Sequence, residues 1–217
     1  MKKIWGIFVL LLLMSCLIIQ MPQPTGKIFS EIYTILSNRP YVNFYLLQIG
    51  ESYMAIDAGA DSVQTARELQ RLDISANDVI AVFVTHSHYD HISALDLFGN
   101  ATVYTGNSTL PNTHHQIMRD GEIIELSGRS IKCIYTPGHT SDSVCYLVDG
   151  KYLFVGDSLI NHLNNTDNEL RKLSIEKLLE LEGLEYIFSG HYGFMNERKF
   201  QKEYRKQIEK RRIQPER

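Results

Sequence analysis

Short apolar runs broken by turn residues make up most of this chain after residue 27. Runs of this kind, when rich in β-branched and aromatic residues, predict strands. We expect strands at 28–36, 42–49, 53–57, 79–84, 101–104, 122–126, 130–135, 143–148, 152–155 and 186–188. Turn residues near Gly50 and at Asp149-Gly150 predict that two pairs of these strands form hairpins.

Helical spacing of apolar residues interrupts the strands at a few places. We expect helices at 61–72, 92–98 and 168–181, the first of them capped by Asp61. The basic segment from Arg198 onward predicts a last helix with a solvated face. The polar stretch 106–121 predicts an irregular loop.

The first 26 residues differ from the rest of the chain. Two lysines precede a nearly continuous apolar run at residues 4–19, and a linker containing two prolines follows. This pattern is typical of an export signal or a membrane anchor, and it keeps the two lysines in the cytoplasm. Residues 13–16 also resemble a lipoprotein cleavage box ending in Cys16, so an uncleaved anchor and a lipidated Cys16 both stay open. We predict a membrane-anchored protein with residues 1–26 as anchor or signal and residues 27–217 as an extracytoplasmic domain.

The composition fits one globular domain after the N-terminal segment. Hydrophobic residues make up 44% of the chain, enough to bury a sizeable core. The formal net charge of −3 gives no sign of a polyanion-binding protein, and we expect no nucleic-acid partner. The oligomeric state is left open by the sequence.

Two cysteines, Cys133 and Cys145, each lie in a predicted strand among apolar neighbours. In an oxidising compartment they would be able to pair across a hairpin, but two buried thiols fit the same pattern. Both alternatives stay open, and neither cysteine is predicted to be catalytic.

Three histidines and a carboxylate follow the predicted strand 79–84 within six residues: His86, His88, Asp90 and His91. Burial alone does not explain them, because apolar side chains there would stabilise the fold more. Imidazole and carboxylate suit divalent zinc, iron or manganese, and the lack of a thiolate argues against a closed structural zinc site. His86 and His88 can point to one side of an extended segment, while Asp90 and His91 face a second point.

Three further candidates follow other predicted strands: His139, Asp157 and His191. Strand exits present side chains at one edge of a sheet, where loops converge over a rigid scaffold. A glycine directly before each candidate permits the tight backbone that such an exit requires. These segments therefore predict one shared site. His114 and His115 follow no predicted strand, and we expect them to be exposed to solvent.

These motifs, in this order, resemble those of the metallo-β-lactamase-fold hydrolases over nearly all of residues 27–217. The matching segments are Ile56-Asp57-Ala58-Gly59, His86-x-His88-x-Asp90-His91, Pro137-Gly138-His139-Thr140, Gly156-Asp157 and Ser189-Gly190-His191. The resemblance implies an α+β fold, a four-layer αβ/βα sandwich with two sheets face to face and helices outside. It also implies a dinuclear metal site in the groove at one edge.

The resemblance further assigns the ligands of the two metals. It implies that one ion is held by His86, His88 and His139, that the other is held by Asp90, His91 and His191, and that Asp157 bridges them. Asp57 would fix the ligand loop through hydrogen bonds. We therefore expect two divalent metal ions, best matched by Zn²⁺, although the same ligands accept iron or manganese.

The ligand set predicts hydrolytic chemistry on a small-molecule substrate. Two cations sharing a water lower its pKa towards about 7, so that hydroxide is available at neutral pH. That hydroxide would attack an acyl carbonyl or a phosphorus, and Asp90 would orient it or carry a proton to the leaving group. Tyr192 and Phe194, beyond His191, would either border the cleft or pack in the core.

Within the family, the resemblance favours the glyoxalase II-like branch and hydrolysis of an ester, thioester or lactone. Asp157 stands where class B1 β-lactamases have a cysteine, and His88 stands where flavodiiron proteins have a glutamate. Only 26 residues follow His191, whereas human-type glyoxalase II binds glutathione with a further helical domain. This difference argues against a glutathione thioester as the substrate.

Three other functions fit parts of the pattern. A phosphodiesterase or nuclease of the ribonuclease Z type shares the histidine cluster, with the basic tail as its support. A persulfide dioxygenase would use His86, His88 and His139 around one iron. A membrane-tethered metal-binding module would keep the ligands and turn over no substrate. Metal content and oxygen uptake distinguish these alternatives.

Overall fold

The computed structural model describes residues 22–213, apart from 39–40, 107–109, 111–113 and 161–167. Two sheets hold its strands. The first sheet has the order β1(Gly26–Lys27), β2(Ile32–Asn38), β3(Tyr41–Ile49), β4(Ser52–Ile56), β5(Val79–Val84), β6(Thr102–Thr105) and β7(His115–Ile117). The second has the order β13(Gly193–Asn196), β12(Tyr186–Ser189), β11(Tyr152–Gly156), β10(Val144–Val148), β9(Arg129–Tyr135) and β8(Ile123–Leu126).

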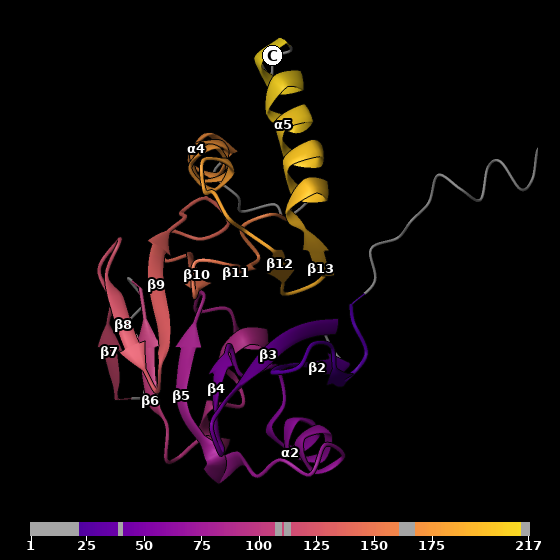
Figure 1. The fold of residues 1–217 in the computed structure, drawn as a ribbon, viewed down its shortest axis with the longest axis vertical. Coiled ribbons are helices and arrows are strands. Elements are labelled where there is room, and N and C mark those ends of the chain that lie inside the picture. Colours follow the sequence, from indigo (N-terminus) through magenta and orange to yellow (C-terminus); the bar gives the residue numbers. More distant parts are fainter. Residues whose placement is uncertain (1–21, 39–40, 107–109, 111–113, 161–167, 214–217) are drawn as a thin grey trace, which may run out of the picture.

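Helices cover the outer faces of both sheets (Figure 1). Helix α2(Ser62–Gln70) lies outside the first sheet, and α4(Asn168–Leu179) and α5(Glu197–Ile213) lie outside the second. The short helix α3(Tyr89–Ile92) follows β5, and 3₁₀ turns span Ala76–Asp78 and Leu95–Leu97. The described residues thus form the four layers of the predicted αβ/βα sandwich.

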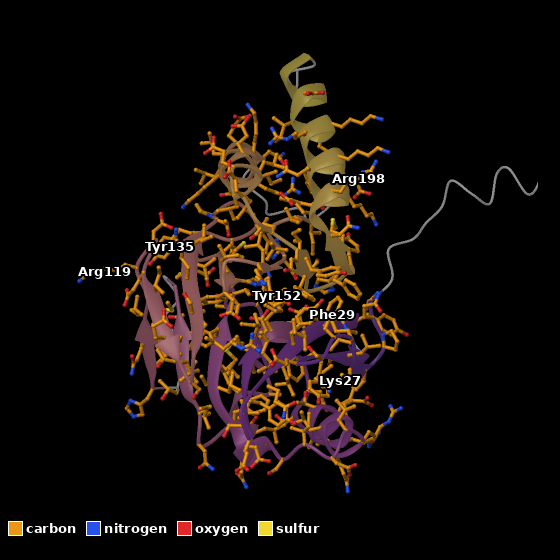
Figure 2. All side chains as sticks on the ribbon, in the orientation of Figure 1. Lys27, Phe29, Arg119, Tyr135, Tyr152 and Arg198 are labelled. Carbon is orange, nitrogen blue, oxygen red and sulfur yellow. The ribbon has the colours of Figure 1, made fainter. Side chains whose placement is uncertain are left out.

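Apolar residues separate into three cores, one at each boundary between layers. The core between the sheets contains Phe83, Tyr146 and Phe154, among others. A second core lies between the second sheet and helices α4 and α5, and a third between the first sheet and α2. Figure 2 shows Phe29 and Tyr152 near the plane where the two sheets meet. Each sheet is therefore buried on both faces, which explains the near-continuous apolar run of β5.

Strand direction places the ends of several strands at the same edge. In the first sheet, β4, β5 and β6 run parallel. In the second sheet β11 is parallel to β12, and β9 shares their direction because both β9 and β11 are antiparallel to β10. The carboxyl ends of β4 and β5, and those of β9, β11 and β12, are therefore brought to common edges of their sheets.

Turn chemistry explains the two predicted hairpins. Gly50, between β3 and β4, has φ 65°. Asp149 and Gly150, between β10 and β11, have φ 53° and 68°, as a tight Asp-Gly turn requires. The predicted cap is also present, since the Asp61 side chain accepts a hydrogen bond from the Gln64 backbone N–H at the start of α2.

Four element predictions need correction. The predicted strand 28–36 begins only at Ile32, because the chain turns between β1 and β2, where the N–H groups of Ile28 and Phe29 both donate to the Ile32 carbonyl. The predicted helix 92–98 does not form, because α3 ends at Ile92 and only the 3₁₀ turn Leu95–Leu97 lies within that range. The stretch 106–121, predicted to be irregular, contains β7, and the chain beyond His191 forms the unpredicted strand β13.

The cysteines do not pair. Cys133 and Cys145 are free thiols on adjacent strands, but they point to opposite faces of the second sheet. Cys133 lies in the core between the sheets, whereas Cys145 lies in the core under α4 and α5. Of the two alternatives from the sequence, buried thiols are therefore the correct one.

Residues 1–21 of the predicted N-terminal segment 1–26, with the apolar run and Cys16, lie outside the described residues, which begin at Pro22. Within the described part of the chain, no helix combines the length and the apolar character needed to cross a membrane.

Candidate metal centre

Strand ends from both sheets carry the polar residues of the site. Asp57 follows β4, and the cluster from His86 to His91 follows β5. His139, Asp157 and His191 follow β9, β11 and β12 of the second sheet. The seven histidine and aspartate side chains predicted as ligands come together in two adjoining groups.

Three imidazoles form the first group. Nε2 of His86 lies 3.0 Å from Nδ1 of His88, and Nε2 of His139 lies 3.2 Å and 3.0 Å from these two atoms. A tetrahedral ion bound by nitrogen at 2.0–2.1 Å would separate its ligands by about 3.3 Å. The triangle of ring nitrogens therefore has nearly the size that such an ion requires.

One carboxylate and two imidazoles form the second group. Nε2 of His191 lies 3.4 Å from Oδ2 of Asp90, and Nε2 of His91 lies 3.9 Å from the same oxygen. His91 is fully buried, and the Asp90 side chain is 12% exposed. His191 is the most exposed of the three, with 23% of its side chain accessible.

Asp157 lies between the two groups. Its Oδ2 is 3.5 Å from Nε2 of His139 and 3.3 Å from Nε2 of His191. Its Oδ1 is 3.4 Å from Nε2 of His91. One buried carboxylate thus faces imidazoles of both groups, which is the position that a ligand shared by two cations would need.

The donor set fits divalent cations. Oδ1 of Asp157 and Nε2 of His91 are buried, and neither has a hydrogen-bond partner among the described residues. Leaving buried polar atoms unsatisfied costs stability, and a cation between them would remove that cost. Seven imidazole and carboxylate donors without a thiolate are ligands that zinc, iron and manganese accept.

Asp57 orients the ligand loop from outside the two groups. Its Oδ1 accepts the Thr85 backbone N–H at 2.7 Å, and its Oδ2 accepts the Thr85 hydroxyl at 2.9 Å. Oδ2 also lies 2.8 Å from Nδ1 of His91. These bonds fix the start of the loop and turn the other nitrogen of His91 towards Asp157.

Close backbone approach explains two of the glycines before the candidate ligands. A Cβ on Gly190 would lie 2.6 Å from Oδ1 of Asp157 and 2.8 Å from Cε1 of His91. A Cβ on Gly156, which has φ 47°, would lie 2.4 Å from the Thr85 hydroxyl oxygen. At both positions a side chain would displace atoms of the site.

Burial and neighbouring charges set the protonation of the candidate ligands. Burial lowers the pKa of His139 to about 4, against the pull of Asp157, and lowers the pKa of His86 well below its usual value. Burial disfavours the charge on Asp157, but the neighbouring His91 and His191 outweigh it and hold this carboxyl pKa well below its ordinary range. Burial also opposes a charge on His191, yet Asp157 and Asp90 raise its pKa to about 10.

These shifts divide the site into two electrostatic regions. The pKa values of His86 and His139 are lowered, so both rings present neutral nitrogens at neutral pH. Burial opposes a proton on His91, but Asp157 and Asp57 raise its pKa well above the usual value. The acids thus attract positive charge into the second group, either as protons or as a bound cation.

Sequence reasoning missed several residues that hold the ligand loops. The Asp142 carboxylate accepts the Ser87 backbone N–H at 2.9 Å, which joins the loop after β9 to the cluster. The hydroxyl oxygens of Thr136 and Ser158 lie 3.0 Å apart and connect the loops of His139 and Asp157. Ordinary polar residues next to motifs carry no sequence signal of this kind.

The other aromatic and histidine predictions can now be placed. Phe194 packs between the sheets against Phe29, with ring centroids 5.3 Å apart, so it belongs to the core. His114 is exposed, whereas His115 is half-buried in β7. Neither His114 nor His115 belongs to the two ligand groups found among the described residues.

Comparisons with known proteins agree with this architecture. A family sequence model described as the metallo-β-lactamase superfamily matches residues 38–106. A solved B3 metallo-β-lactamase with an active-site glutamic acid superimposes with a TM-score of 0.70 at 17% identity, covering 91% of this chain and 93% of that one. At this identity the likeness shows the fold.

Two curated relatives extend the comparison. An atrochrysone carboxyl ACP thioesterase of Aspergillus fumigatus is 26% identical over 79% of this chain and 58% of its own length. A hydroxyacylglutathione hydrolase of Francisella philomiragia is 34% identical over 48% of this chain and 45% of its own length. This chain therefore spans about half the length of the curated relatives that it matches. The matched segment 38–106, the shared sandwich and these relatives agree with the five motifs, and the chain is similar to the metallo-β-lactamase superfamily.

Proposed function

We propose that this chain is a metal-dependent hydrolase that cleaves an ester, thioester or lactone. The observation that carries the proposal is the position of Asp157, a buried carboxylate that faces imidazoles of both ligand groups. A closed structural site would not need such a shared acid, because four ligands around one ion suffice there.

The two groups would divide the ligands between two divalent cations. His86, His88 and His139 would hold one ion, Asp90, His91 and His191 the other, and Asp157 both. Zn²⁺ matches this mixture of imidazole and carboxylate best, and iron or manganese are the other candidates. When bound, such a pair of cations would supply a hydroxide nucleophile at neutral pH and polarise the substrate carbonyl.

The residues of the chain would perform the proton transfers. Burial opposes the charge on Asp90, but the hydrogen bond to His191 lowers the pKa of its carboxyl, so that Asp90 is ionised at neutral pH. An ionised carboxylate at this point can accept the proton of the attacking water and deliver it to the leaving group. Asp57 would not exchange a proton with the substrate, because both of its carboxylate oxygens are hydrogen-bonded to Thr85 and His91.

Acyl transfer to water is favoured over the other reactions by the relatives. One is named a thioesterase and another a hydroxyacylglutathione hydrolase, so both act on thioesters. The branch that we propose is glyoxalase II-like, with two metals and Asp157 as their shared ligand.

Exposed groups indicate the side from which a substrate would approach. Ser87, His88 and Tyr89 are exposed, while the other ligands of the three-histidine group are buried. Tyr89 is 63% exposed and lies in the sequence between two proposed ligands. Tyr41 is 62% exposed, and its backbone carbonyl oxygen lies 2.5 Å from Nδ1 of His191. These two aromatic rings would contact the apolar part of a substrate.

We also propose that the domain is held at a membrane by the N-terminal segment. Its support is the apolar run at residues 4–19 with two lysines before it.

The first described residues lie close to the site. The Gln23 backbone N–H donates to the Asn43 side chain at 2.8 Å, and Gly193 packs on the Gln23 side chain. Detergent extraction of the full chain from a membrane fraction, and labelling with palmitate that Cys16→Ser abolishes, would test tethering and lipidation.

A substrate panel with metal analysis tests the hydrolase proposal. The metal content of the full chain in detergent is measured as purified, and zinc-loaded and iron-loaded samples are assayed on an ester, a thioester, a lactone, a phosphodiester and, with an oxygen electrode, a persulfide. We expect about two zinc ions per chain and turnover of at least one of the three acyl substrates. Asp90→Ala should lose that turnover while its circular dichroism stays native.

Other outcomes would replace the proposal with a named alternative. Turnover of the phosphodiester alone would indicate a nuclease or phosphodiesterase. One iron per chain with oxygen uptake would indicate a persulfide dioxygenase. Two metals with no turnover on the whole panel would favour a metal-binding module without catalysis.

A further inference from the structure

A buried tyrosine of the second sheet holds a strand end of the first. Tyr146 in β10 is fully buried, and its hydroxyl donates to the Val84 carbonyl at 2.9 Å. Val84 is the last residue of β5, two positions before His86. The Val144 backbone N–H donates to the Thr85 carbonyl at 2.8 Å, so two residues of β10 bind the two successive carbonyls at this strand end.

A second buried tyrosine makes the opposite connection. Tyr45 in β3 of the first sheet donates to the Ser189 carbonyl at 2.7 Å, and its hydroxyl lies 3.2 Å from the Gly193 carbonyl. Ser189 and Gly193 enclose the turn that carries His191. Asn43, on the same face of β3, donates its backbone N–H to the Gly190 carbonyl at 2.5 Å.

The two hydroxyls thus cross the interface between the sheets in opposite directions. The surrounding core is apolar, and apolar contact has no preferred direction, so it permits small shifts of one sheet over the other. A hydrogen bond fixes distance and direction together. Burial raises the pKa of both phenols, Tyr45 and Tyr146, so each keeps its proton and remains a donor.

We propose that Tyr146 and Tyr45 are positioning residues that set the two halves of the metal site against each other. Tyr146 would hold the three-histidine group through the end of β5, and Tyr45 would hold His191 through its turn. This inference rests on the proposed function, because it requires that the two groups bind metal. It predicts that each hydroxyl supports the affinity of one metal more than that of the other.

Cobalt titration of the full chain in detergent measures the two affinities separately. Co²⁺ replaces zinc and reports each binding step by its visible absorption, and His88→Ala and His191→Ala assign the steps to the two groups. We expect Tyr146→Phe to lower the cobalt affinity of the first group, the three histidines, by roughly tenfold. Tyr45→Phe should lower the cobalt affinity of the second group, which contains His191, by a similar factor. The other step should change by less than about threefold in each variant.

Tyr135 provides a matched control. Its hydroxyl also crosses from the second sheet to the first, donating to the Met118 carbonyl at 2.9 Å, but Met118 adjoins no proposed ligand. Figure 2 shows Tyr135 on the β8–β9 side of the molecule, away from Phe29. Tyr135→Phe should lower the denaturant midpoint and leave both cobalt affinities unchanged.

Isosteric replacement separates the hydrogen bond from the packing. At positions 45 and 146, 4-methylphenylalanine fills the space of the hydroxyl without a donor, whereas 4-aminophenylalanine keeps a donor. If the phenylalanine variants do not fold, this pair carries the test. We expect the amino residue to restore the affinity that the methyl residue loses.

Three results would overturn the inference in different ways. If the native chain binds two cobalt ions and all tyrosine variants retain both affinities, the tyrosines have no positioning role, while the metal site stands. If the native chain binds no cobalt, the proposed metal pair fails and this inference fails with it. Equal losses in Tyr45→Phe, Tyr146→Phe and Tyr135→Phe would show a general loss of stability and would also overturn it.

Discussion

Nδ1 of His91 lies 2.8 Å from Oδ2 of Asp57, although 34 positions separate the two residues in the chain. The same oxygen accepts the Thr85 hydroxyl at 2.9 Å. Because Asp57 takes Nδ1, only Nε2 of His91 is available to the site. A residue directly after β4 thus decides how a candidate ligand after β5 presents its ring.

Replacing Asp57 should weaken metal binding without removing a ligand. In Asp57→Asn the charge is lost and one of the three accepted hydrogen bonds meets an amide NH₂ group. We expect the zinc affinity of the second group, which contains His91, to fall by roughly 10- to 100-fold, as is usual when the hydrogen-bond partner of a histidine ligand is lost. Equilibrium dialysis against zinc, with metal analysis, measures it.

Asp61→Asn is the control for this prediction. Asp61 is also a carboxylate that accepts a backbone hydrogen bond, but it caps α2. Its replacement by another good cap should leave zinc affinity unchanged. Equal zinc affinity in Asp57→Asn and the native chain would contradict the role assigned to Asp57.

A methyl group at Gly190 should disturb the site directly. The new Cβ would lie 2.6 Å from Oδ1 of Asp157 and 2.8 Å from Cε1 of His91. We expect Gly190→Ala to lower the free energy of unfolding by about 1–3 kcal/mol, as overpacking does. Zinc affinity should fall as well, because both displaced groups are proposed ligands.

Gly99→Ala tests whether this effect is local. A Cβ on Gly99 would meet nothing within 4 Å, and its φ is not positive. Chemical denaturation should show a change within about 0.5 kcal/mol for this variant. A Gly190→Ala protein with native stability and native zinc affinity would show that the close approach has been relieved without cost.

Much of the site could be predicted because its signals are local. The ligand cluster directly follows the apolar run 79–84, and a glycine precedes His139, Asp157 and His191. The direction of the strands then brings the residues after their carboxyl ends together. Predicting this meeting requires only that the strands are assigned correctly. The tight turn at Asp149-Gly150 was predictable for the same reason, since its φ angles follow from its own residues.

Features that depend on register or on tertiary packing could not be predicted. Cys133 and Cys145 are neighbours in the sheet, but their register, which the sequence does not fix, sends them to opposite faces. Strand β13 has only four residues and is held by pairing with β12, so its own pattern is weak. In the sequence, Tyr45 and Tyr146 look like ordinary core aromatic residues. Only the structure shows that their hydroxyls donate to the carbonyls of Ser189 and Val84.

The two cysteines should react only when the chain unfolds. Burial raises the pKa of Cys133 to about 12 and that of Cys145 to about 11, so both remain thiols at neutral pH. We expect no alkylation of either residue by iodoacetamide in the native chain and complete alkylation in denaturant, without prior reduction. A disulfide-linked peptide containing Cys133 and Cys145 in mass spectrometry would contradict the free thiols.

Removing the metal should destabilise the fold. A ligand that binds only the folded state at a free concentration of 100 times its Kd stabilises it by about 2.7 kcal/mol. For a chain of this size the corresponding change in Tm is roughly 5–10 °C. Differential scanning calorimetry with a chelator and after addition of zinc measures it, and an unchanged Tm would argue against metal binding at the two groups.

Asp157 should matter to both metals, unlike any other proposed ligand. Its two oxygens face His91, His139 and His191, so Asp157→Asn removes a charge that both cations would share. We expect zinc content to fall from two ions to at most one, with a loss of affinity greater than the roughly 100-fold seen for indirect partners. Hydrolysis should be abolished.

Asp149→Asn shows whether this loss is specific to the site. Asp149 lies in the turn between β10 and β11, where its carboxylate contacts Nη1 of Arg129 at 2.6 Å and accepts the Ser130 backbone N–H at 3.0 Å. Its replacement should lower stability by about 1 kcal/mol and leave two zinc ions bound. If Asp157→Asn also retained two ions, the carboxylate would not be shared, and the proposed pair of adjoining metals would be wrong.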